Sequence, residues 1–261
     1  MRFALGIEYD GSDFSGWESQ PRQRTVQSTL ESALSSVADG AIKIVCAGRT
    51  DAGVHALAQV VHFDSCAERA PHEWVLGANS NLPGDVSVCW ASPVAQDFHA
   101  RYSALYRHYR YVIHNRRERS ALLRQRAAWE RIPLDITPMQ AAGEHLLGEH
   151  DFSSFRAAGC QAKGPVRTVV GLEVHRRGAL VFIDISANAF LQHMVRNIAG
   201  SLVAIGCGDE PAQWLGEVLQ SKDRKQGGIA APPHGLTLTR VDYPAEFAIP
   251  ANPGAEAADS R

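Results

Sequence analysis

The chain has 261 residues, of which 45% are hydrophobic and 21% charged, enough apolar material for one large domain or two of ordinary size. No basic and apolar leader precedes the first apolar alternation, and no apolar run is long enough to span a bilayer, so we expect no membrane association. The five cysteines are scattered and include no Cys-x-x-Cys pair, which disfavours disulfides or a zinc site and favours the reducing cytoplasm. A formal net charge of −2 argues, taken alone, against a nucleic-acid partner.

The first half of the chain alternates strand and helix patterns. Apolar residues at every second position indicate strands, and apolar residues three to four apart indicate helices. In chain order, these patterns predict a strand at 3–9, a helix from Thr25 that Gly40 ends, strands at 42–47 and 57–63, a short helix around 74–76, and a strand at 86–90. The predicted order is therefore β-α-β-β-α-β.

The second half repeats this order with one additional helix. The Thr-Pro-Met-Gln stretch at 137–140 fits a capping box with proline at the first helical position. In chain order, we predict a strand at 107–113, the helix that opens at 137–140, a hairpin of strands 168–174 and 179–185, helices at 190–205 and 214–219, and a strand at 236–241.

Two units of this order predict an α+β fold. We expect two ferredoxin-like, or RRM-like, halves whose antiparallel sheets are joined side by side, with helices on one face and the active-site cleft between the halves. The halves are placed at 1–103 and 104–245. Residues 246–261 are rich in Pro, Ala and Glu, which predicts a disordered tail.

The loop at 48–56 contains the most informative candidate for chemistry. It places Asp51 between glycines, with Arg49 before it and His55 after it, although many such aspartates merely form a turn. A metal site would need further carboxylates or histidines, and the loop offers only His55. A phosphate-binding loop would need a Gly-rich stretch ending in Lys-Ser or Lys-Thr, and a paired-carboxylate hydrolase would need a second, identifiable carboxylate. What remains is a lone carboxylate that acts as a nucleophile or base beside Arg49, without a metal.

Two further segments contain candidate side chains. In the strand at 107–113, Tyr109 lies on one face and Arg110 on the other, which fits either core packing or a tyrosine that stacks on a base beside phosphate-binding arginines. In the segment 188–198, Arg196 falls off the apolar stripe of the predicted helix. It is either a solvent-facing arginine or a guanidinium that pairs with Asp51 and keeps that carboxylate ionised.

Arginines concentrate between residues 101 and 131, where the only acidic residues are Glu118 and Glu130. The arginines are Arg101, Arg107, Arg110, Arg116, Arg117, Arg119, Arg124, Arg126 and Arg131. A local run of this kind can supply phosphate contacts that the net charge of the whole chain hides, or it can be a solvated basic face.

Six segments, taken together, resemble motifs of the TruA family of tRNA pseudouridine synthases, in the same order along the chain. They are residues 9–17, 48–56, 97–101, 109–111, 151–156 and 188–197. The resemblance implies that Asp51 is the catalytic aspartate, Arg49 displaces a base, Tyr109 is the active-site tyrosine and Arg196 pairs with the aspartate. One departure is Glu18, which follows the Gly-Trp pair where the family commonly has Gln.

The resemblance also implies an activity and partners. The activity would be isomerisation of uridines 38, 39 and 40 in the anticodon stem-loop of tRNA, without a cofactor, by a homodimer that holds one tRNA across both subunits. The target base would be flipped out of the stem. We expect further contacts to RNA from Arg101, Arg110, Arg116, Arg117 and His55.

Two alternatives belong to other classes of protein. A catalytically silent RNA-binding protein built on two RRM-like sheets would want exposed aromatic residues in adjacent strands, but no Arg-Thr-Asp loop. An aspartate-nucleophile hydrolase of phosphoesters or halides would need an Asp-x-Asp-x-Thr pattern and a parallel sheet, and the sequence predicts neither. The residues leave open whether Asp51 attacks the ribose C1′ or the uracil C6.

Overall fold

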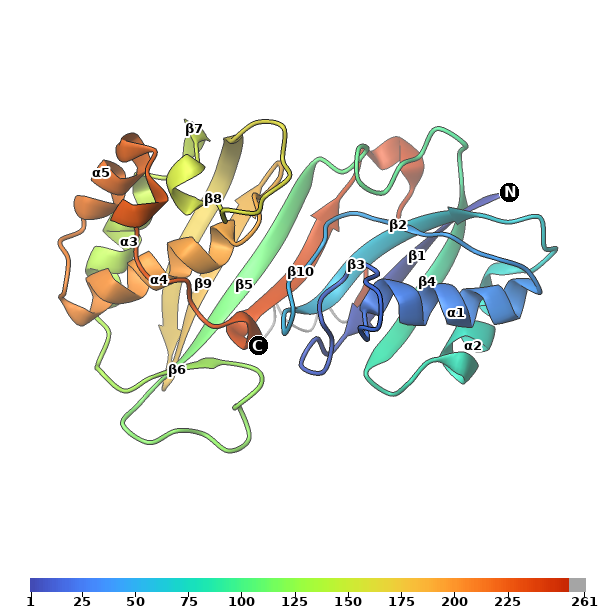
Figure 1. Cartoon of the computed structure of the whole chain (residues 1–261), viewed down its shortest axis with the longest axis horizontal. Helices are drawn as coiled ribbons and strands as arrows, with labels where there is room; N and C mark the ends of the chain where they lie inside the picture. Colours follow the sequence, from blue (N-terminus) through green and yellow to red (C-terminus); the bar gives the residue numbers. More distant parts are fainter. Residues whose placement is uncertain (254–261) are drawn as a thin grey trace. The chain divides into compact units, whose positions relative to one another are not determined.

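A computed structural model describes residues 1–253, whose backbone contacts divide into two compact units (Figure 1). Unit 1 comprises Met1–Arg107 together with the chain from Thr237 onwards, and unit 2 comprises His108–Leu236. The α+β class is confirmed, since both units combine sheets and helices. The sequence analysis assigned the last strand to the second half, whereas the structure groups it with unit 1.

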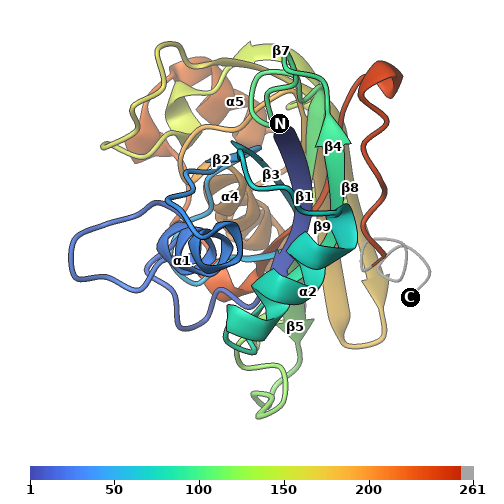
Figure 2. The same ribbon diagram turned by 90° about the vertical axis from the view of Figure 1, so that its right-hand side faces the viewer.

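Within residues 1–253, unit 1 is a sheet backed by the helices α1 and α2. In chain order, its elements are β1 (Arg2–Tyr9), α1 (Val26–Ala38), β2 (Val45–Cys46), β3 (His55–Asp64), α2 (Pro71–Asn81), β4 (Val86–Val94), β10 (Leu236–Asp242) and the 3₁₀ turn η4 (Ala245–Phe247). The strands lie in the order β4-β1-β3-β10, and β2 also pairs with β3. Figure 2 shows α1 and α2 close together beside this sheet.

Aromatic packing joins α2 to the strands. Trp74 of α2 is fully buried, and its ring lies 5.5 Å from that of Phe3 in β1 and 4.9 Å from that of Phe63 in β3. Leu30 and Leu34, one turn apart on α1, are also fully buried. The predicted alternation at 3–9 and the predicted helical stripe from Thr25 are both confirmed.

Two short strands, β2 and β10, pair with the edge of β3 that faces away from β1. The two-residue strand β2 pairs antiparallel with Val61 and His62 near one end of β3, and β10 pairs in parallel with His55 and Ala56 at the other. The strand predicted at 42–47 is shortened to Val45–Cys46, because the N–H groups of Ile42 and Ile44 donate to side chains of α1 instead of to β3. The parallel pairing of β10 also departs from the purely antiparallel sheets that we expected.

Unit 2 contains five strands and three helices. In chain order, its elements are β5 (Tyr106–Asn115), β6 (Ala128–Glu130), α3 (Ile136–Glu144), β7 (Gly148–Asp151), η1 (Ser153–Phe155), β8 (Val166–Arg177), β9 (Leu180–Ala187), α4 (Met194–Cys207), α5 (Trp214–Ser221), η2 (Arg224–Gln226) and η3 (Pro233–Gly235). The strands lie in the order β5-β9-β8-β7, with β6 parallel to β5. The predicted hairpin of β8 and β9 is confirmed, and Gly178 supplies the positive φ of 59° in its turn.

Local chemistry moves two predicted helix starts. The carboxylate of Asp135, rather than Thr137, caps α3 by accepting the Thr137 N–H at 2.9 Å. The helix predicted from residue 190 begins at Met194, because His193 adopts a left-handed conformation with φ of 63°.

Part of the predicted tail packs on unit 1. Residues 245–247 form η4, and the ring of Phe247 meets the ring of Phe98 at 5.2 Å. The prediction of disorder from residue 246 is therefore wrong for this stretch, because the half-buried ring of Phe247 packs against the unit. The rest of that prediction, for residues 254–261, lies outside the described residues.

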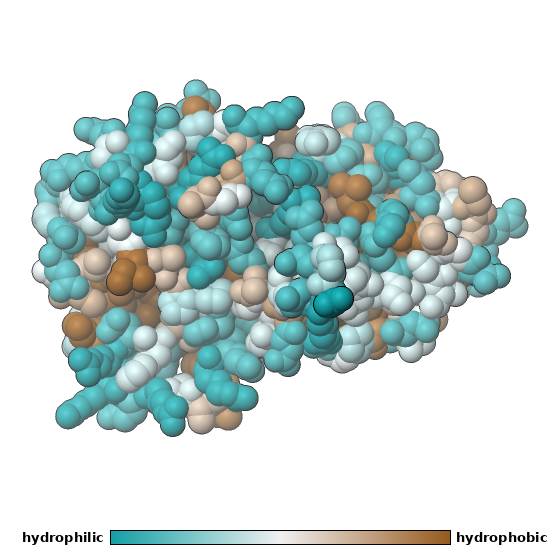
Figure 3. All heavy atoms as spheres, viewed as in Figure 1, coloured by the Kyte–Doolittle hydropathy of each residue, from teal (hydrophilic) through white to brown (hydrophobic). Residues whose placement is uncertain are grey.

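Hydrophilic residues cover most of the face seen in Figure 3. Within residues 1–253, no helix combines the length and apolar character that a bilayer crossing requires.

His62 makes the stability of the fold depend on pH. It is buried in β3, its Nδ1 accepts the Ala100 N–H at 3.1 Å, and its ring lies 4.8 Å from that of His99. Burial, followed by the nearby charges of His99 and Arg2 and opposed by Asp64, lowers the pKa of His62 to about 4. In the unfolded chain, His62 binds a proton at a higher pH than it does in the folded protein. The free energy of unfolding should therefore fall as pH drops from about 6.5 towards 4.

Chemical denaturation of the parent and of His62→Gln at several pH values checks this expectation. Gln cannot titrate, so the stability advantage of the parent over the variant should shrink as pH falls through this window. An advantage that is constant from pH 7 to pH 4 would contradict the assignment.

Candidate active site

The Asp51 loop connects β2 to β3 within unit 1. Asp51 is partly buried, Thr50 is buried and Arg49 is exposed. The loop turns at Gly53, whose φ is 79°, and the Val54 N–H donates to the Asp51 carbonyl at 3.1 Å. Glycine is needed at this position because side chains disfavour a positive φ. The carboxylate therefore sits on a tight turn rather than on a long flexible arm.

Two glycines of the segment 9–17 lie directly against the Asp51 loop. A Cβ on Gly11 would collide with the Val54 carbonyl oxygen, and a Cβ on Gly16 would lie 3.0 Å from the Thr50 carbonyl oxygen. Gly16 also has a φ of 96°. The next residue, Trp17, donates its N–H to the Thr50 carbonyl at 3.0 Å. The spacing of these glycines thus serves a close approach of two backbones.

Buried polar side chains fix the part of the loop that precedes Asp51. The hydroxyls of Tyr9 and Thr50 share a hydrogen bond of 2.7 Å. The amide of Gln59, which is fully buried, accepts the Gly48 N–H at 3.3 Å and donates to the Gly48 carbonyl at 2.6 Å. Such satisfied buried groups make the loop rigid, since each bond broken would leave a polar atom unpaired away from water.

The side chain of Arg107 holds the backbone at Ala47, just before the same loop. Its buried guanidinium donates to the Ala47 carbonyl at 3.0 and 3.3 Å, to the Ala104 carbonyl at 3.0 Å, and to the Arg101 carbonyl. The sequence analysis counted Arg107 with the basic run. The structure shows instead an internal arginine that ties three carbonyls together.

Arg49 and His55 flank Asp51 in different ways. The guanidinium of Arg49 forms an ion pair of 2.6 Å with Glu18, and each side chain is about half exposed. His55 is 2% exposed, and its Nδ1 accepts the Gly11 N–H at 3.0 Å and lies 3.1 Å from an Asp10 carboxylate oxygen. We therefore assign His55 to the packing of the loop rather than to an RNA contact. The sequence analysis noted Glu18 as a departure from the family pattern but did not predict its ion pair with Arg49.

Tyr109 and Arg110 lie on opposite faces of β5 in unit 2, as the alternation predicts. Tyr109 is 7% exposed, and its ring meets the Phe190 ring edge to face at 5.1 Å. Arg110 makes a two-pronged ion pair with Asp184 of the neighbouring strand β9, at 2.7 and 3.0 Å. Because Asp184 neutralises its charge, Arg110 is a weaker phosphate ligand than the sequence indicated.

Arg196 lies in the first turn of α4 and is held by the main chain. Its Nε donates to the Ala231 carbonyl at 2.9 Å, and the Ala231 N–H donates to the Arg196 carbonyl at 2.9 Å. Burial, followed by the nearby charge of Arg196, lowers the pKa of His234. Arg196 belongs to unit 2 and Asp51 to unit 1, and their pairing stays a prediction.

The remaining predicted RNA contacts lie on exposed surfaces. Arg101 of unit 1 is exposed, with its guanidinium 5.9 Å from the centre of the Tyr102 ring. Arg116 and Arg117 are exposed on the loop that follows β5 in unit 2. No cluster of three or more His, Cys, Asp or Glu side chains within the described part of the chain is arranged to hold a metal ion.

Comparison with known proteins identifies the family. A family model described as tRNA pseudouridine synthase matches residues 6–103 and 142–244. The chain belongs to the tRNA pseudouridine synthases. It is therefore an isomerase that acts in tRNA pseudouridylation, and the resemblance drawn from the six motifs is confirmed.

Similar proteins cover nearly the whole chain. The tRNA pseudouridine synthase A of Nitrosococcus oceani is 60% identical over 250 residues, which is 96% of each chain. That of Coxiella burnetii is 54% identical over 97% of each chain, and that of Methylococcus capsulatus is 53% identical over 95% of this chain and 92% of its own. Among solved structures, a chain of a Cbf5-Nop10-Gar1 complex matches with a TM-score of 0.36 and 11% identity, over 90% of this chain and 57% of that chain, which is too weak to support an argument.

The close contact between the backbones of Gly11 and Val54 can be tested by adding a methyl group at Gly11. Gly11→Ala should lower the free energy of unfolding by about 2 kcal/mol or more, because the methyl group has no space beside Val54. Gly84→Ala in the same unit is the matched control: nothing lies within 4 Å of its added Cβ, so it should be neutral or stabilise by up to about 1 kcal/mol. Denaturant titrations measure both, and equal effects would refute the proposed contact.

Proposed function

We propose that this synthase isomerises uridines 38, 39 and 40 of the tRNA anticodon stem-loop, with Asp51 as the nucleophile. The observation that carries the proposal is a partly buried carboxylate on a turn that is fixed by Gly11, Gly16 and Gln59, with an arginine two residues away. A nucleophile must be held at a set position to attack a bound base or sugar, and a rigid loop provides this.

The reaction rearranges bonds within one nucleotide. The N1–C1′ bond breaks, the uracil turns while it stays bound, a C5–C1′ bond forms, and the proton on C5 leaves while N1 gains one. Substrate and product have the same composition, so the reaction requires no oxidant, reductant or group donor. Asp51 would attack either the ribose C1′ or the uracil C6 and then leave when the new bond is complete.

Three other residues have roles in this proposal. Arg49 would enter the space that the flipped base leaves in the stem. Its ion pair with Glu18 supports this role, because a pair half exposed on both sides stabilises by only about 1 kcal/mol or less and RNA can displace it. Tyr109 would stack on the uracil and assist removal of the C5 proton. Arg196, oriented by its bond to the Ala231 carbonyl, would pair with Asp51 and keep it ionised.

The proposal extends to assembly and architecture. The family resemblance supports a homodimer that holds one tRNA across both subunits in the cytoplasm, with two ferredoxin-like halves in each subunit. Membership of the synthase family excludes the alternative of a catalytically silent RNA-binding protein.

Asp51→Asn should abolish the chemistry and spare the binding. Pseudouridine formation in an unmodified tRNA transcript should fall at least about 1,000-fold, because the amide cannot act as the nucleophile. Affinity for the tRNA should stay within a few-fold of the parent, since basic surfaces provide most of it. Transcripts with a single uridine at position 38, 39 or 40 test the site assignment. Near-parental turnover in Asp51→Asn would disprove the nucleophile.

Arg196→Lys should greatly reduce turnover while it changes the stability of the fold only slightly. Lysine keeps the charge but loses the planar fork that orients a carboxylate, so turnover should fall by orders of magnitude. The thermal midpoint should fall by only a few degrees, since one hydrogen bond to Ala231, worth about 1 kcal/mol, is lost. Arg177→Lys, at an exposed arginine of the β8–β9 hairpin, is the matched control and should keep parental turnover. Full activity of Arg196→Lys would return Arg196 to a structural role.

A further inference from the structure

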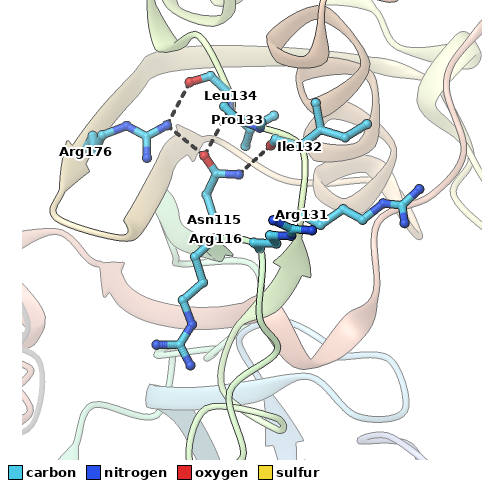
Figure 4. Close-up of a pocket in the computed structure, with 8 residues that line it drawn as sticks. Asn115, Arg116, Arg131, Ile132, Pro133, Leu134 and Arg176 are labelled. Atoms are coloured by element: carbon cyan, nitrogen blue, oxygen red, sulfur yellow. Dashed lines mark hydrogen bonds between the residues drawn. The ribbon is translucent and has the colours of Figure 1, made fainter.

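A cavity of about 700 Å³ opens in unit 2, where the end of β5 meets the segment 131–134 (Figure 4). Half of its eight lining residues are arginines, and none is acidic. The arginines are Arg116, Arg117, Arg131 and Arg176. A concave surface with this composition attracts anions, and a phosphate group is the anion that arginine pairs with best.

The wall of this cavity is built around one buried amide. Asn115, 8% exposed, donates to the carbonyls of Glu130 and Ile132 at 3.0 and 2.6 Å. Its carbonyl oxygen accepts the Leu134 N–H and one Arg176 nitrogen, both at 3.0 Å. All four hydrogen-bonding positions of the amide are therefore used, as Figure 4 shows in part. The wall is fixed before any ligand binds, which reduces the entropy that binding would cost.

The arginines contribute in two ways. Arg176 is part of the wall, because its Nη2 also donates to the Leu134 carbonyl at 2.8 Å. Arg116 and Arg131 extend from the rim in different directions in Figure 4. Within residues 1–253, the side chains of Arg117 and Arg131 make no hydrogen bond or ion pair. Their charges can therefore be given to a ligand without breaking an existing contact.

The surroundings favour RNA over a free anion. Trp129 of β6 is 47% exposed, and its indole N–H donates to the Arg116 carbonyl at 2.9 Å, which holds it beside the basic rim. Ile132, in the wall itself, is 43% exposed. An inorganic anion gains little from these apolar groups. A nucleotide has both a phosphate and a flat base, and it can use the arginines and the indole together.

We propose that this cavity binds a backbone phosphodiester of the RNA substrate, with a neighbouring nucleotide against Trp129. It is a contact separate from the reacting uridine, and it serves affinity rather than chemistry. The inference rests on the proposed function for the identity of the RNA as tRNA. Its test measures equilibrium binding, so it can succeed or fail independently of the role of Asp51.

The double variant Arg117→Ala/Arg131→Ala tests the phosphate contact. Affinity for an unmodified tRNA transcript should fall about tenfold or more at low salt, and the slope of log affinity against log salt should decrease by roughly 1.4 to 1.8. Turnover at saturating tRNA should stay parental, so the loss appears in KM and not in kcat. Arg69→Ala/Arg177→Ala removes the same charge from exposed sites outside the cavity and should change affinity less than about threefold.

Trp129→Ala tests the nucleotide contact. It should weaken tRNA binding several-fold without changing the salt slope, because the indole carries no charge. The proposal is overturned if the double variant keeps parental affinity and slope, or if the control pair loses as much. It is also overturned if Trp129→Ala binds tRNA like the parent, or if the double variant loses binding of inorganic phosphate while it keeps its affinity for tRNA.

Discussion

The rest of the candidate site depends on the contact between two backbones in unit 1. The segment 9–17 lies so close to the Asp51 loop that Gly11 has no room for a side chain, and Gly16 combines a tight contact with a left-handed conformation. Because this segment is held there, Tyr9 reaches Thr50, Gly11 meets His55, and Glu18 meets Arg49. Each of these contacts would be lost if the two backbones moved apart by the width of a methyl group.

Much of the fold could be predicted from local pattern. The apolar pattern at 3–9 and the helical stripe after Thr25 gave correct elements, because the apolar residues of both patterns are buried against neighbouring elements. The failures have causes outside the mispredicted segments. The strand at 42–47 was overestimated because the Ile42 and Ile44 N–H groups donate to the side chains of Ser35 and Glu31 in α1 instead of to β3. The packing of Phe247 was missed because its partner Phe98 lies far away in the sequence.

The candidate site was located by its motifs, but the partners of its side chains were not. Nothing near Arg107 in the sequence indicates that its guanidinium turns inward to carbonyls such as that of Ala47. Likewise, the sequence around Arg110 does not indicate Asp184, which lies on another strand and neutralises the charge of Arg110. A charge count along the chain measures how many arginines are present, whereas RNA binding depends on how many stay unpaired once the sheets have formed.

The pairing of β10 with β3 also sets an order of completion during synthesis. Residues 1–107 leave the ribosome before unit 2, yet part of the β3 edge stays uncovered until Thr237 and Leu238 emerge. At about 5–20 residues per second, the intervening unit takes roughly ten seconds to make. An exposed strand edge is a template for association with other nascent chains during that interval. Unit 1 is therefore begun before unit 2 and completed after it, and its early solubility depends on the residues or partner proteins that shield that edge.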